Sequence, residues 1–198
     1  MKLRLLSASL LIALGSVGAY AQTTAGTVQR DVNQQTRIEN GLQNGSLNVK
    51  EAGRLEKEES RVDRLQAKDL KDGNLSPRER AQLRRAQNKA SQDIHAAETN
   101  KVKGNPESAS NERMQADVQR NINQEKRIEA GVQSGALTKK ETAQLERGQA
   151  RVDRREARAA RNGHVGAGEQ ARIQTAENRQ SGEIFAEKHD QRVAHRAK

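Results

Sequence analysis

The chain of 198 residues has no cysteine and no tryptophan, and it has only two prolines, one tyrosine and one phenylalanine. Without cysteine it can form no disulfide, no thiolate metal site and no lipidated cysteine. The scarcity of aromatic side chains argues against recognition of single-stranded nucleic acid by base stacking. After residue 21 the chain has 27 Val, Ile, Leu, Met and Phe residues. Because so few apolar residues can be buried, we expect a thin hydrophobic core.

Charged residues and strong helix formers take the place of the missing apolar residues. Lysine and arginine number 36, aspartate and glutamate number 26, and the formal net charge is +10. Ala, Glu, Gln, Lys, Arg and Leu, which all favour the α-helix, dominate the chain. The composition therefore predicts an all-α protein of marginal stability, and it leaves self-association open.

The first 21 residues have the pattern of a secretory signal peptide. Lys2 and Arg4 precede a short apolar run, Leu5 to Leu14, and an Ala-Tyr-Ala cleavage site ends at Ala21. The sequence therefore predicts cleavage after Ala21 and a periplasmic or secreted bacterial protein. An uncleaved membrane anchor is the alternative, but the apolar run is short for one.

An internal duplication with an offset of 90 residues organises the rest of the chain. From Gln29 to Ala96, 28 of 68 residues are identical to those 90 positions later, which indicates two equivalent units. Gly, Asn, Pro and Ser are concentrated between the copies, as is typical of a linker. We therefore divide the chain into a signal peptide (1–21), a first helical unit (22–103), a linker (104–111) and a second helical unit (112–198).

Each unit is predicted to contain three helices, because apolar residues recur in it at helical spacing. The expected ranges are Val28–Gln43, Asn48–Asp72 and Ser76–Asn100 in the first unit, and Glu112–Gln133, Thr138–Arg161 and Ala167–Arg196 in the second. The apolar stripe of the second helix is narrow and is interrupted at Glu58 and Glu59. The sequence therefore predicts two tandem three-helix units built as long helical hairpins or loose bundles.

The four turns inside the units share the frame Gly-x-aliphatic-x-x-x-Glu, beginning at Gly45, Gly73, Gly135 and Gly163. Glycine suits the left-handed position that ends a helix. In three turns Asn, Ser or Thr follows as the expected N-cap, with Glu three residues later completing a capping box. In the fourth turn Gly166 stands at the N-cap, so we expect the last helix to begin weakly.

The same frame resembles the calcium loop of the EF-hand family, which has Gly at loop position 6, an aliphatic residue at 8 and Glu at 12. This resemblance implies a helix–loop–helix calcium module with degenerate loops. Asp72 and Glu79 match ligand positions of the second loop, but Lys68 and Arg158 stand where two of the loops need an acid. Calcium takes six to eight oxygens, and no loop supplies enough. The sequence therefore favours helix capping, and we expect no metal and no other cofactor.

Two helix starts also resemble those of Spy/CpxP-type periplasmic helical chaperones, which carry Leu-Thr-x-x-Gln. This chain has Leu-Thr-x-x-Glu at 137–141 and Leu-Ser-x-x-Glu at 75–79. The resemblance implies a periplasmic stress protein or holdase chaperone.

Lysine and arginine recur at steps of three and four along the second helix of each unit, which places their side chains on one helix face. A solvated polar face is the alternative to a binding site, but five positions from Lys57 to Lys71 are basic in both copies. We call the two sets the basic ridges. They are Lys50, Arg54, Lys57, Arg61, Arg64, Lys68 and Lys71 in the first copy, and Lys140, Arg147, Arg151, Arg154, Arg158 and Arg161 in the second.

Ridges of this kind predict an exported interaction protein that binds an anionic polymer or an anionic membrane or envelope surface. Nucleic acid would be bound only non-specifically. The four histidines, at 95, 164, 189 and 195, are scattered, and no nucleophile–base set or phosphate-binding glycine loop is present. We therefore expect neither an enzyme nor a small-molecule substrate. The holdase and the calcium module stay as alternative functions.

Overall fold

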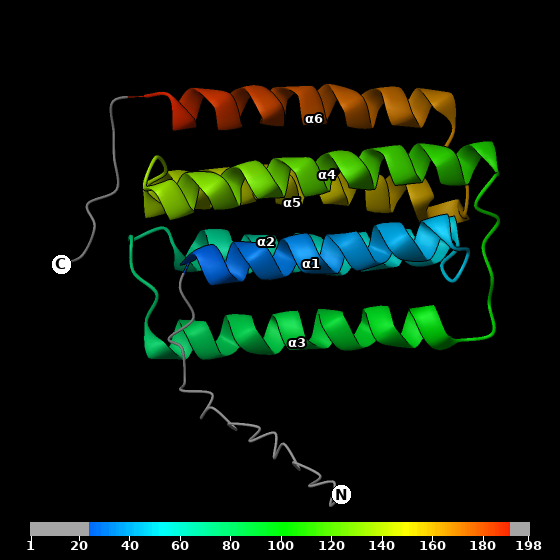
Figure 1. The fold of residues 1–198 in the computed structure, drawn as a ribbon, viewed down its shortest axis with the longest axis horizontal. Helices are drawn as coiled ribbons and strands as arrows, with labels where there is room; N and C mark the ends of the chain where they lie inside the picture. The colour runs from blue at the N-terminus through cyan, green and yellow to red at the C-terminus, as the bar shows by residue number, and fades with distance from the viewer. Residues whose placement is uncertain (1–23, 191–198) are drawn as a thin grey trace, which may run out of the picture.

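The computed structural model describes residues 24–190, which form six long α-helices (Figure 1). The helices are α1 (Thr24–Gln43), α2 (Val49–Asp69), α3 (Pro77–Thr99), α4 (Ala109–Ser134), α5 (Lys139–Ala159) and α6 (Ala167–Lys188), with a short 3₁₀ turn, η1 (Ala160–Asn162), after α5. The all-α class is therefore confirmed. The predicted signal peptide, His195 and the last residues expected in the final helix lie outside the described residues.

The turns have the predicted capping chemistry. All four frame glycines, Gly45, Gly73, Gly135 and Gly163, have φ between +74° and +85°, which favours glycine. Asn48, Ser76 and Thr138 each accept a hydrogen bond from the backbone N–H of the glutamate three residues later, and that glutamate accepts one from the backbone of its cap residue. The frame thus fixes where each helix ends and the next begins.

The fourth helix begins earlier than the sequence predicts. Ser108 caps α4 by accepting a hydrogen bond from the N–H of Asn111, so the helix begins at Ala109, inside the expected linker. α6 begins without a side-chain cap at Gly166, but Glu169 accepts a hydrogen bond of 2.9 Å from the Gly166 N–H. Half of a capping box is therefore present at the fourth turn.

Each copy attaches its third helix to its first through the same polar bonds. Gln34 on α1 donates to the carbonyl of Gln87 on α3 at 2.8 Å, and Gln124 on α4 donates to the carbonyl of Glu177 on α6 at 2.9 Å. Arg37 and Arg127 likewise bind the backbone and hydroxyl oxygens of the serine at the matching position of α3 and α6. The duplication seen in the sequence is therefore also present in the structure.

The two copies pack against each other through α1 with α4 and α2 with α5, the most extensive helix pairs of the described chain. Both pairs run antiparallel, and α3 and α6 lie on opposite outer sides (Figure 1). The Ser60 hydroxyl donates to the carbonyl of Ala150, its own counterpart in the other copy, at 2.9 Å. Contact between equivalent residues is typical of a two-fold arrangement. The fold therefore joins both copies in one four-helix centre, a pairing that the predicted long helical hairpins or loose bundles did not specify.

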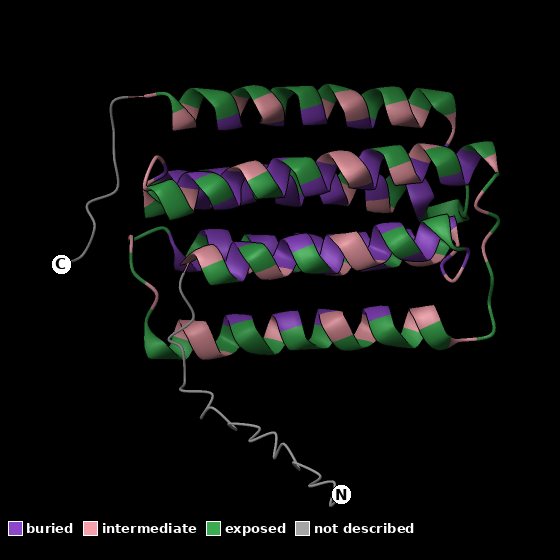
Figure 2. Ribbon diagram, in the orientation of Figure 1, coloured by how far each residue is buried: buried purple, intermediate pink, exposed green. Residues whose placement is uncertain are grey.

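Buried residues are concentrated on the four central helices (Figure 2). The largest apolar cluster includes Leu42 and Leu55 from the first copy and Met114, Ile122 and Ile173 from the second. Many buried positions of the same helices are nevertheless Gln, Asp or Glu. The thin apolar core that the composition predicts is thus completed by polar side chains.

The packing of α2 against α5 and η1 depends on small residues, and this can be tested at Gly53. A Cβ atom at Gly53 would lie 2.4 Å from the Cβ of Ala160, so Gly53→Leu must separate the helices. We expect the free energy of unfolding to fall by about 1–3 kcal/mol, measured by urea denaturation with circular dichroism. Gly182→Leu on α6 is the control, because no atom lies within 4 Å of its Cβ position. An equal gain in stability from both variants would contradict the packing described here.

Candidate polyanion-binding groove

The basic ridges lie on the outer faces of α2 and α5. Twelve of their thirteen side chains are exposed, and Arg154 is half-buried. The apolar partners Leu55 and Val62 are buried on the inner side of α2. The spacing of three and four residues therefore separates the cations from the core, as the sequence predicts.

Antiparallel packing brings the two ridges together. Gly53 lies against Ala160, and Ser60 lies against Ala150, so the helix backbones approach closely. The cations that flank these small residues on α2 then face those on α5. The two ridges, which are 90 residues apart in the sequence, thus line the two sides of one groove.

That feature is a groove of about 550 Å³ whose floor contains Gly53, Ser60 and Ala157. Its walls carry eight cations, which are Lys50, Arg54, Lys57, Arg61, Arg64, Arg154, Arg158 and Arg161. Within residues 24–190, Arg61 is the one member of this set with an ion pair, formed with Glu58 on its own helix. The basic groove, as we call it, thus concentrates positive charge that the protein leaves largely uncompensated.

The remaining ridge residues, Lys68, Lys71, Lys140, Arg147 and Arg151, do not line the groove. Arg151 instead forms an ion pair of 3.6 Å with Glu183 on α6. Gln144 on α5, the ridge position without a charge, donates a hydrogen bond of 2.9 Å to Glu187, which is also on α6. Acidic residues of α6 therefore engage two positions of the second ridge, and both positions lie outside the groove.

A second feature, missed in the sequence, is a group of eight buried carboxyl groups between the central helices. They are Asp31 on α1, Glu56, Glu59 and Asp63 on α2, Glu125 on α4, and Glu146, Asp153 and Glu156 on α5. Burial raises the pKa of every one of them, to about 7 for Glu56 and Asp63. Within this group of eight, a described arginine lowers the pKa of one carboxyl group: Arg30 lies near Asp31 and opposes the effect of burial there.

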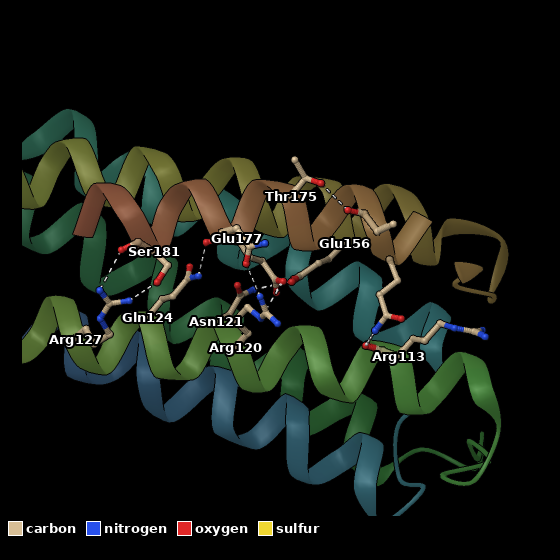
Figure 3. A network of polar contacts seen from close by, with 12 residues as sticks. Arg113, Arg120, Asn121, Gln124, Arg127, Glu156, Thr175, Glu177 and Ser181 are labelled. Carbon is tan, nitrogen blue, oxygen red and sulfur yellow. Dashed lines mark hydrogen bonds and ion pairs between the residues drawn. The ribbon is translucent and has the colours of Figure 1, made fainter. Parts of the chain in front are cut away.

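A related network joins α4, α5 and α6 (Figure 3). The Glu177 carboxylate on α6 is fully buried and forms an ion pair of 3.2 Å with Arg120. Burial raises the pKa of Glu177 to about 8 and that of Asp117 to about 7, against the opposing effect of Arg120. Asn121 donates to both oxygens of Glu156 at 2.9 Å. Proton uptake by these carboxyl groups is therefore coupled to folding.

The loops that resemble EF-hands use their glutamates for capping. Glu51, Glu79, Glu141 and Glu169 each accept a hydrogen bond from the backbone N–H three residues earlier. Glu51 also accepts one from the side chain of Asn100 at 2.8 Å. These bonds account for the frame without a bound ion.

No family model, no curated protein and no solved structure matches this chain. Among the helices of residues 24–190, none is both long and apolar enough to cross a membrane.

Proposed function

We propose that the protein is an exported, non-enzymatic interaction protein whose basic groove binds polyanionic components of the cell envelope or its surroundings. The observation that carries this proposal is the meeting of two basic ridges, one from each copy, in one groove with eight cations. A row of this kind attracts a linear polyanion, because each contact releases counterions from the polymer.

The lining favours a flexible, highly charged chain over a small molecule. The groove is walled by long Lys and Arg side chains, which adapt to spaced sulfate, phosphate or carboxylate groups. The lining on α2 runs from Lys50 to Arg64, about 20 Å along the helix, enough for several repeating units of a polymer. With one Phe in residues 24–190, base stacking contributes little, and binding of nucleic acid is expected to be independent of sequence.

The described surface gives the holdase alternative less support. Its exposed large hydrophobic residues in residues 24–190 are Val102 and Phe185, whereas a chaperone that captures unfolded clients needs a contiguous apolar surface. Binding of a polyanion, in contrast, requires a charged surface, and the basic groove supplies one.

The test is a binding assay on immobilised heparin and on lipopolysaccharide, with neutral dextran as the matched matrix. We expect retention on both anionic matrices at low salt, elution as the salt concentration rises, and no retention on dextran. The proposal is wrong if the protein passes through heparin and lipopolysaccharide at low salt as it does through dextran.

A further inference from the structure

The buried carboxyl groups form two equivalent cages that include oxygens from facing helices. In the first cage Asp31, Asp63 and Glu146 each offer one oxygen, and these oxygens lie within 4.8 Å of one another. In the second cage the same is true of Glu56, Asp153 and Glu156. All six residues are at most 3 % exposed.

The duplication relates the two cages residue by residue. Asp63 corresponds to Asp153 and Glu146 corresponds to Glu56. Asp31 corresponds to Asn121, which donates to Glu156 and Asp153 in the second cage. Glu156 corresponds to Gln66, whose amide lies against Asp31 and Glu146 in the first cage without the alignment of a regular hydrogen bond. Each cage thus has three carboxyl groups and one amide, and the amide stands at a different corner in each.

The cages meet at the centre of the molecule, where the side chains of Asp63 and Asp153 contact each other. These two residues are counterparts, so the contact lies on the approximate two-fold relation between the copies. Carboxylates that project inward from facing helices are the usual ligands of paired metal ions in helical bundles.

Several oxygens of the cages have no hydrogen-bond partner among the described residues. They include Asp31 Oδ2 and both side-chain oxygens of Glu146 in the first cage, and Glu56 Oε1 and Asp153 Oδ2 in the second. A buried polar atom without a partner is costly. Protons shared between carboxyl groups relieve part of the charge, but a shared proton engages one oxygen of each carboxyl group and leaves the other oxygen without a partner.

We propose that these cages bind two oxygen-preferring divalent cations, one in each cage. The donors are the oxygens of three carboxyl groups, up to six in each cage, with no imidazole or thiolate, a set that suits calcium or manganese better than zinc. The interior position leaves little room for the waters that magnesium usually retains. Two dications would balance half of the charge of eight ionised carboxylates.

At two corners of the cages, one copy has an acid where the other has the matching amide. Replacing the acid by that amide is therefore expected to leave the fold intact. Asp31→Asn gives the first cage the amide that the second already has at that corner, and Glu156→Gln does the converse in the second cage. Glu59→Gln is the matched control, because Glu59 is buried beside the cages but outside both, and its counterpart is Gln149.

The experiment uses the mature chain, stripped with EDTA and then supplied separately with Ca²⁺, Mn²⁺, Mg²⁺ or Zn²⁺ at pH 7.5. Bound metal is counted by mass spectrometry after gel filtration, and affinity is measured by calorimetry. We expect about two Ca²⁺ or Mn²⁺ ions per chain. Asp31→Asn and Glu156→Gln should each weaken one site 10-fold or more, as expected for loss of a charged ligand, and Glu59→Gln should retain both.

Three results would overturn the inference. They are less than half an equivalent of Ca²⁺ and Mn²⁺ bound at millimolar concentration, equal affinity in the wild type and the Asp31→Asn, Glu156→Gln double variant, or preference for Zn²⁺. Circular dichroism of each variant verifies folding, and the wild-type metal count decides the question even if a variant fails to fold.

Discussion

Replacing Arg54, Lys57, Arg158 and Arg161 by glutamine is expected to weaken binding to heparin by roughly 10-fold or more at 0.15 M salt. All four residues line the basic groove, and none has an ion pair among the described residues. Each removed cation loses a contact and the counterions that the contact releases. The loss in affinity should therefore shrink as the salt concentration rises, because both proteins converge on weak binding.

The control for this variant carries the same change in net charge elsewhere. Arg78, Arg84, Arg85 and Lys103 are exposed and lie on or after α3, away from the groove lining. Their replacement by glutamine should change affinity by less than 3-fold, or roughly 0.6 kcal/mol. If the two quadruple variants lose equal affinity, binding depends on net charge alone and the groove has no special role.

The second large effect is a loss of folding stability as the pH rises. Burial raises the pKa of Glu177 in the folded protein to about 8, with Asp117, Glu156 and Arg120 as its charged neighbours. Between the unfolded and folded pKa values the folded chain holds more protons than the unfolded chain, so stability falls as pH rises. From pH 6 to 9, in EDTA, we expect Glu177 alone to lower the free energy of unfolding by about 2–3 kcal/mol.

Glu177→Gln isolates this effect. The corresponding residue of the first copy is Gln87, which is fully buried and donates to Asp31 and to the carbonyl of Thr27, so an amide is compatible with the site. Urea denaturation across the pH range should show a shallower decline for the variant and greater stability than the wild type at pH 9. Identical slopes for the two proteins would show that Glu177 stays ionised in the folded state.

The repeated turns and the ridges could be predicted from the sequence because their chemistry is local. A glycine, a capping residue and a glutamate three positions on determine a turn within seven residues. Likewise, cations at steps of three and four share a helix face whatever the helix packs against. Both features needed no knowledge of the tertiary contacts.

The pairing of the copies and the buried carboxyl groups could not be predicted in this way. Glu59 and Asp63 alternate with Lys57, Arg61 and Arg64 in the sequence, so they read as parts of one solvated face. Their burial depends on α5, which is about 90 residues away and packs against α2. The duplication nevertheless contains a signal of this burial. An acid in one copy often has an amide at the equivalent position of the other copy, as with Glu59 and Gln149. That exchange preserves size and hydrogen bonding, which matters in a core and little on a surface.

The most direct measurement of the central claim is the salt dependence of wild-type binding to a short DNA duplex, used as a polyanion of known charge spacing. With eight cations in the groove, engagement of most of them gives a plot of log affinity against log salt with a slope of roughly −4 to −7. A slope shallower than about −2 would mean that fewer than three cations act together. In that case the two ridges do not form one binding surface.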